Sequence, residues 1–216
     1  MQITPSQMRL YAITDSRWLH GRTLYDCVEA ALQGGVTMLQ IREKHCSTAE
    51  LTELAIPIVS LCHTYNVPCI INDDIQAAKD SGADGVHVGQ MDASIAQARA
   101  ILGKGKWIGT SAHNVQEAVQ AQLDGADYIG TGAVFGSVTK QDATALSLET
   151  LQAICRAVTI PVVAIGGITT ENTLQLAGFG GQGIAVISAI FAQADITAAA
   201  KQIRMLADIV CGGTVA

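Results

Sequence analysis

Residues 82–88 read Gly-Ala-Asp-Gly-Val-His-Val, and residues 125–130 read Gly-Ala-Asp-Tyr-Ile-Gly. Each stretch ends a segment of helical periodicity and begins a short apolar run, and Gly34-Gly35-Val36 repeats the pattern. A glycine at such a junction supplies the left-handed conformation that commonly ends a helix, and an apolar run of four to eight residues is typical of a buried strand. The repeated junction therefore predicts strands that each follow a helix.

Eight such apolar runs alternate with helical segments. They are residues 10–14, 36–41, 68–71, 85–88, 107–109, 128–130, 161–165 and 183–187. Alternating strands and helices imply a parallel sheet, because a parallel return needs a crossover. Eight units fill all 216 residues and leave little room for a second domain. We therefore predict that residues 1–216 form one α/β domain, a (β/α)₈ TIM barrel rather than a doubly wound sheet, with its active site at the C-terminal ends of the strands.

The composition excludes several classes of protein. Apolar residues make up 49% of the chain, charged residues 15%, and the net charge is −6, which argues against a general nucleic-acid binder. No run approaches the roughly 18 apolar residues of a membrane span, and residues 1–9 lack the apolar stretch of a signal peptide. We expect a cytoplasmic protein with small-molecule substrates and with no nucleic-acid or membrane partner. Whether it forms a homo-oligomer is left open.

Two familiar motifs are set aside because of their context. The glycines of residues 178–183 fit G-x-G-x-x-G, but they follow a helical segment and precede a strand, whereas a dinucleotide fingerprint needs the reverse order. The six cysteines have no C-x-x-C spacing and no paired histidines, so we interpret them as mostly small core residues in a reducing compartment.

Polar residues end the second predicted strand. With a period of two, Gln40, Arg42 and Lys44 share one side, while Leu39 and Ile41 face the helices. A solvated loop explains Lys44 easily but does not explain an amide inside an apolar strand. Two cations and an amide at a barrel mouth therefore favour a receptor for a phosphorylated anion.

Carboxylates follow the next two strands. Asp73 and Asp92 come just beyond adjacent strand ends, where they could share one Mg²⁺ with substrate phosphate oxygens. Helix capping is the competing explanation: it is the better one for Asp74 and, taken alone, about as good for Asp92. The neighbouring cations favour a metal site at Asp73 and Asp92.

A second anion site is indicated at the last strands. Gly167 and Ser188 follow strands seven and eight, the usual place for phosphate in barrels of this type. The loop after strand six offers hydroxyls and Lys140. The five histidines share no spacing and receive no catalytic role, and no nucleophile motif is present.

With these residues in place, the sequence resembles the thiamine-phosphate synthase family over nearly the whole chain. The matching segments are residues 11–15 (YAITD), 40–44 (QIREK), 71–74 (INDD), 85–90 (GVHVGQ), 109–113 (GTSAH), 125–130 (GADYIG), 164–168 (AIGGI) and 186–188 (VIS). The resemblance implies a transferase of thiamine biosynthesis. Such an enzyme joins 4-amino-2-methyl-5-(diphosphomethyl)pyrimidine to a thiazole phosphate, releasing pyrophosphate and forming thiamine phosphate.

The resemblance also implies roles for individual residues. The pyrimidine diphosphate would be held by Gln40, Ile41, Arg42, Glu43, Lys44, Asn72, Ser111 and Lys140. The thiazole phosphate would be held by Ser137, Val138, Thr139, Gly167, Ile187 and Ser188. Asp73 and Asp92 would hold Mg²⁺, and Arg42, Ser111 and Lys140 would act in catalysis.

Two alternatives are kept. A thiazole tautomerase of the same fold would release no pyrophosphate, but that type generally lacks the aspartates and the Thr139-Lys140 pair found here. A non-catalytic barrel that binds thiamine precursors is favoured only by Ala133, Gly136 and Ser137, where the family usually has prolines and a threonine. These three positions bear on thiazole-phosphate affinity more than on the chemistry.

Overall fold

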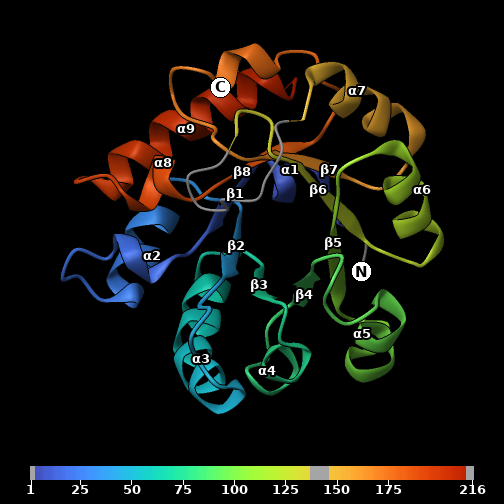
Figure 1. The fold of residues 1–216 in the computed structure, drawn as a ribbon. Helices are drawn as coiled ribbons and strands as arrows, with labels where there is room; N and C mark the ends of the chain where they lie inside the picture. The colour runs from blue at the N-terminus through green and yellow to red at the C-terminus, as the bar shows by residue number, and fades with distance from the viewer. Residues whose placement is uncertain (1–2, 137–145, 213–216) are drawn as a thin grey trace.

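Eight parallel strands close into a barrel in the order β1 to β8, with the helices outside the ring (Figure 1). The structure is a computed structural model and describes residues 3–136 and 146–212. The strands are β1 Leu10–Ile13, β2 Met38–Ile41, β3 Cys69–Asn72, β4 Gly85–Val88, β5 Trp107–Ala112, β6 Tyr128–Gly132, β7 Val162–Ile165 and β8 Gly183–Val186. The predicted TIM barrel is confirmed.

Helices connect the strands over most of the circuit. They are α1 Pro5–Met8, α2 Leu24–Gln33, α3 Thr48–Thr64, α4 Ile75–Asp80, α5 Ile95–Leu102, α6 Val115–Leu123, α7 Leu148–Ala157, α8 Ser188–Phe191 and α9 Ile196–Val210, with 3₁₀ turns η1 Ser16–Trp18 and η2 Thr173–Leu176. No helix in the described ranges has the length and apolar character to cross a membrane. Side-chain caps begin most of them. Asp74 accepts from the Ala77 amide and starts α4, as the sequence predicts, whereas Ser94 rather than Asp92 starts α5.

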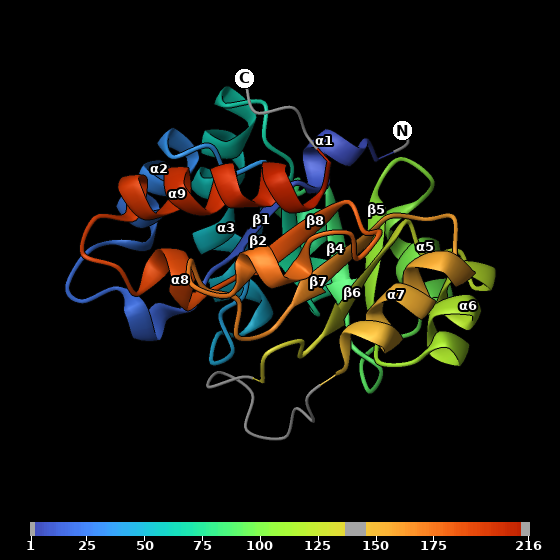
Figure 2. The same cartoon turned by 90° about the horizontal axis from the view of Figure 1, so that it is seen from above.

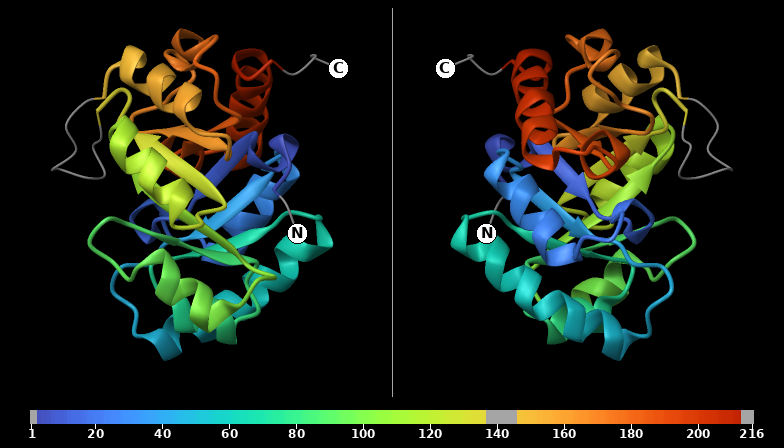
Figure 3. Two further views of the ribbon diagram at one scale, coloured as in Figure 1. Left: turned by 90° about the vertical axis from the view of Figure 1, so that its right-hand side faces the viewer. Right: turned by 90° about the vertical axis from the view of Figure 1, so that its left-hand side faces the viewer.

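Side chains of the strands form two separate cores, one on each face of the sheet. The outward side chains, such as Leu39 and Ile41, pack against the surrounding helices. The inward ones, such as Met38 and Ile70, fill the barrel together with Met8 of α1. Helix α1 lies at the end of the barrel where α9 finishes (Figures 2 and 3), and an ion pair of 3.3 Å between Arg9 and Asp208 joins these two segments. The barrel is therefore plugged at one end.

The junctions predicted from glycine are confirmed. Gly35, Gly82 and Gly125 have φ angles of 93°, 76° and 90°, and each lies between a helix and the next strand. The G-x-G-x-x-G segment likewise precedes β8 and opens no helix. All six cysteines are free, but Cys46 is exposed, so the core interpretation fails at that position.

Strand ends differ from the prediction by up to three residues. β5 continues to Ala112 and β6 to Gly132, while β2 begins only at Met38. The added residues include Thr110, Ser111 and Thr131, whose polar side chains hid the end of each strand from a rule based on apolar runs. Ser111 therefore lies on β5 itself.

Candidate active site

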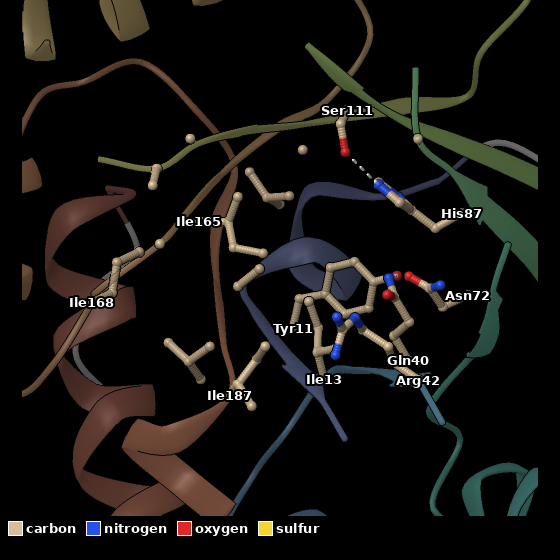
Figure 4. Close-up of a pocket in the computed structure, with 18 of the residues that line it drawn as sticks. Tyr11, Ile13, Gln40, Arg42, Asn72, His87, Ser111, Ile165, Ile168 and Ile187 are labelled. Carbon is tan, nitrogen blue, oxygen red and sulfur yellow. Dashed lines mark hydrogen bonds between the residues drawn. The ribbon is translucent and has the colours of Figure 1, made fainter. Parts of the chain in front are cut away.

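A pocket opens at the C-terminal ends of the strands, and all eight strands or the loops that follow them contribute to its wall. One side is polar and includes Gln40, Asn72 and His87, whereas Ile165 and Ile187 lie on the other side (Figure 4). The pocket can therefore hold a ligand with one polar and one apolar region.

The polar side begins with a buried cation. Arg42 is 9% exposed and lies 3.6 Å from Asp15. Its backbone amide donates to the Thr14 hydroxyl, which in turn donates to Glu43. Lys44 lines the same wall. The end of β2 is thus held by β1 while two positive side chains face the pocket.

Two carboxylates lie beside these cations. Burial, and then the charge of Asp92, raises the pKa of the Asp73 carboxyl above its ordinary value of 3.8. Asn72 Nδ2 donates to Asp73 at 2.6 Å, and the Gly89 amide donates to Asp92 at 2.6 Å. Within the described ranges no three His, Cys, Asp or Glu side chains gather as a metal centre. Two mutually repelling carboxylates still fit a hard cation that takes its other ligands from substrate or water.

The deep part of the pocket contains hydrogen-bonding groups that link five strands, β1, β2, β4, β5 and β6. We call this set the polar chain; its members are Gln40, Tyr11, Tyr128, His87 and Ser111. Consecutive members lie 2.7, 2.8, 3.1 and 3.1 Å apart. Burial raises the pKa of both phenols, so each keeps its proton.

The opposite side carries the backbone of the β7 loop. Gly167 has a φ of 64°, and a Cβ there would lie 2.6 Å from the Phe135 carbonyl oxygen. Asn172 Nδ2 donates to the Gly167 carbonyl at 2.8 Å. Ser188 begins α8 and also lines the pocket. A glycine is required here because the chain passes directly against the β6 loop.

The structure gathers most of the predicted site residues. The pocket is lined by Gln40, Arg42, Lys44, Asn72, Asp73, Asp92, Ser111, Gly167, Ile187 and Ser188. The side chain of Ile41 lies instead in the outer core, and the Glu43 carboxylate accepts from Thr14 and does not line the pocket. Ser137, Val138, Thr139 and Lys140 lie outside the described residues.

Sequence reasoning missed Tyr11 and His87, which both line the pocket. The signal was present at His87. Val86 and Val88 are buried in the outer core, so alternation along the strand sends the side chain between them to the barrel interior. His113 also lines the pocket, where its Nδ1 is 3.0 Å from Glu117.

A TIM barrel with cations and paired carboxylates at the strand ends is typical of enzymes that act on phosphorylated small molecules. Comparison with known proteins identifies the family. The profile of the thiamine monophosphate synthase family matches residues 10–190, and the chain belongs to this family.

Individual relatives cover nearly the full chain. A protein of Ruminiclostridium cellulolyticum named thiamine-phosphate synthase is 50% identical, with 90% of this chain and 92% of that protein covered. The protein of that name from Chloroflexus aurantiacus is 47% identical over 93% of each chain. The solved structure of thiamine phosphate pyrophosphorylase from Pyrococcus furiosus superposes with a TM-score of 0.88 at 36% identity, covering 95% of this chain and 98% of that one.

Proposed function

We propose that this chain is a thiamine-phosphate synthase that works at the barrel mouth. The reaction joins the pyrimidine diphosphate to the thiazole phosphate: the bond from the pyrimidine methylene to the diphosphate oxygen breaks, and a bond from that carbon to the thiazole nitrogen forms. Family membership supports the reaction. The observation that carries the site is the meeting of Arg42 and Lys44 with Asp73 and Asp92 in one pocket.

The leaving group determines what the charged side chains do. Arg42 and Lys44 would bind the diphosphate oxygens and stabilise the negative charge that grows as pyrophosphate leaves. Asp73 and Asp92 would hold Mg²⁺, which when bound supplies further neutralisation of that charge. Lys140 is proposed to join them, and its part rests on the resemblance of the sequence alone.

The remaining groups position the reactants. The pyrimidine ring would lie against the deep polar part of the pocket, where its amino group stabilises the positive charge left on the methylene carbon. The isoleucines of the opposite wall would exclude water from that carbon. Gly167, Ile187 and Ser188 would receive the thiazole phosphate, together with residues 137–139. No protein nucleophile is needed, because positioning and charge stabilisation are sufficient.

The test is direct turnover. The protein is incubated with both substrates and Mg²⁺, and pyrophosphate and thiamine phosphate are quantified. Asp92→Ala and Asp92→Asn should lower kcat/KM by at least about a hundredfold and weaken the Mg²⁺ dependence. Asp80→Asn, which removes a carboxylate from the exposed end of α4, is the matched control.

Each outcome separates the candidate functions. Equal formation of both products, lost in the Asp92 variants, supports the synthase and the metal site. Isomerisation of the thiazole phosphate without pyrophosphate would favour the tautomerase. Tight substrate binding without any product would favour a binding barrel and overturn the proposal.

A further inference from the structure

The polar chain runs continuously beneath the pocket and connects residues far apart in the sequence. Tyr11 and Tyr128, whose hydroxyls are 2.8 Å apart, are 117 positions apart along the chain. Their side chains are 1% and 0% exposed. An unsatisfied buried O–H destabilises the fold, so each of these two hydroxyls needs an acceptor for its own proton. Along the polar chain, donors and acceptors must therefore alternate in one direction.

The order can be followed from one end. Gln40 Nε2 donates to the Tyr11 hydroxyl at 2.7 Å. Among the described residues, the side-chain partners of that hydroxyl are Gln40 and Tyr128. Since an amide nitrogen cannot accept, the Tyr11 proton goes to Tyr128.

The same reasoning continues to the imidazole. Tyr128 accepts from Tyr11, so its own proton is directed to His87 Nδ1 at 3.1 Å. A nitrogen that accepts carries no proton, and the neutral ring then has its proton on Nε2. That Nε2–H donates to Ser111 Oγ at 3.1 Å, the contact drawn in Figure 4.

We propose that the polar chain has this single polarity and that it presents the Ser111 hydroxyl proton to the bound ligand. Because Ser111 Oγ accepts from His87, its proton is available to a ligand acceptor. Tyr11, Tyr128 and His87 are positioning residues in this scheme. The inference rests on the proposed function, in which the acceptor is an unprotonated ring nitrogen of the aminopyrimidine.

Packing around the polar chain restricts its rings. The ring centroids of His87 and Tyr128 are 5.6 Å apart, and those of Tyr11 and Tyr128 are 5.9 Å apart in an edge-to-face arrangement. A Cβ built on Gly130 would lie 3.3 Å from His87 Cε1, so that glycine leaves the imidazole its place. The geometry is thus held by the barrel and does not depend on a ligand.

The first experiment measures the tautomer in the ligand-free protein. Ring-nitrogen NMR in alkaline buffer distinguishes a protonated from an unprotonated imidazole nitrogen, and a His87→Gln spectrum assigns the signals. We expect Nε2 protonated and Nδ1 unprotonated. The opposite tautomer would overturn the proposal. It would mean that the hydrogen bonds of the polar chain are donated in the direction from Ser111 to Gln40, with the Gln40 amide turned so that its oxygen accepts from Tyr11.

A pair of matched variants tests the order of the links. Tyr128→Phe removes the hydroxyl that donates to Nδ1, and we expect a mixture of tautomers. Tyr11→Phe removes a hydroxyl of equal burial and with it the donor that fixes the direction of the Tyr128 proton, but Tyr128 can still donate to Nδ1, so the shift towards the other tautomer should be smaller than in Tyr128→Phe. Thermal unfolding shows whether both variants fold. Retention of the wild-type tautomer in a folded Tyr128→Phe protein would contradict the order.

The second experiment tests the ligand contact by binding. Ser111→Ala should weaken binding of the pyrimidine diphosphate about tenfold, as expected for a lost hydrogen bond of roughly 1.4 kcal/mol. Two analogues of the pyrimidine diphosphate each have a CH group in place of one ring nitrogen. The analogue that lacks the nitrogen accepting from Ser111 should bind with the same affinity to the wild type and to Ser111→Ala. If neither analogue removes the difference, the Ser111 contact is refuted. A failure of turnover alone would refute the proposed function and leave the tautomer result standing.

Discussion

Gly109 of β5 leaves the space in which Tyr128 lies. A Cβ built on Gly109 would overlap the Cζ and hydroxyl atoms of Tyr128, whose side chain is fully buried. Gly105 lies four residues earlier, has no atom within 4 Å of an added Cβ and has no positive φ. Gly109→Ala and Gly105→Ala therefore add the same methyl group to a crowded and to an open position.

The expected loss of stability follows from two terms. Forcing a methyl group into a packed core costs about 1–3 kcal/mol. Displacing Tyr128 also breaks its bonds to Tyr11 and His87, each with a net contribution of about 1 kcal/mol. We expect Gly109→Ala to lose about 3–5 kcal/mol, which for a chain of this size lowers Tm by about 6–20 °C.

The assay is thermal unfolding followed by circular dichroism, with urea unfolding as a check. Gly105→Ala should stay within about 0.5 kcal/mol of the wild type. Equal Tm values for the two variants would refute the reasoning, because they would mean that Tyr128 moves away without cost. The double variant Gly109→Ala/Tyr128→Ala provides a further check. Its loss of stability should be smaller than the sum of the losses of the two single variants, because the added methyl group no longer clashes with the Tyr128 ring.

Three further changes test other parts of the structure. The hydrogen bond from Arg17 holds the pKa of Asp15 below 3.8, although burial of the carboxyl opposes this shift. The ionised carboxylate therefore stabilises the fold above pH 3.8, and this stabilisation is lost as the pH falls through the lowered pKa. Urea unfolding should show that Asp15→Asn is less stable than the wild type at neutral pH and equally stable in acid. Asp74→Ala removes the cap of α4 and should cost about 1 kcal/mol in the same assay. Gly167→Ala brings a Cβ to 2.6 Å from the Phe135 carbonyl oxygen at a positive φ, and steady-state kinetics should show a raised KM for the thiazole phosphate with a smaller change for the pyrimidine diphosphate. An unchanged ratio of the two KM values would contradict the assignment of Gly167.

The sequence predicts those parts of the site that follow from alternation along one strand. Gln40 and Arg42 line the pocket, and Ile41 between them faces the helices, because side chains alternate across a strand whatever the neighbouring strands do. The same rule places His87 inside the barrel, between Val86 and Val88 of the outer core.

Contacts between distant strands could not be predicted in this way. The pairing of Tyr11 with Tyr128 depends on the register and closure of the whole barrel, which no local pattern contains. Asp73 is a second example. Its φ of 54° is uncommon for a residue other than glycine, and a rule that reads Asp after a strand as a loop or cap residue does not predict it. The Tyr11–Tyr128 contact and the backbone conformation of Asp73 are both set by tertiary structure.

Neutral hydrogen-bonding side chains lie deep in the pocket, and charged side chains lie nearer its rim. Tyr11, Gln40 and His87 belong to the strands, and both phenols of the polar chain stay neutral because burial raises their pKa. Arg42 and Asp73, by contrast, lie just beyond strand ends. In the proposed reaction, a substrate with a neutral ring and a diphosphate group would have its lowest energy with the ring deep and the diphosphate at the rim, because Arg42 and Lys44, the Arg and Lys side chains that line the pocket among the described residues, lie beyond the end of β2. The same gradient would draw the departing pyrophosphate outward and leave the reactive carbon facing the isoleucines. Orientation and direction of departure then have one physical cause, the order of residues along the strands.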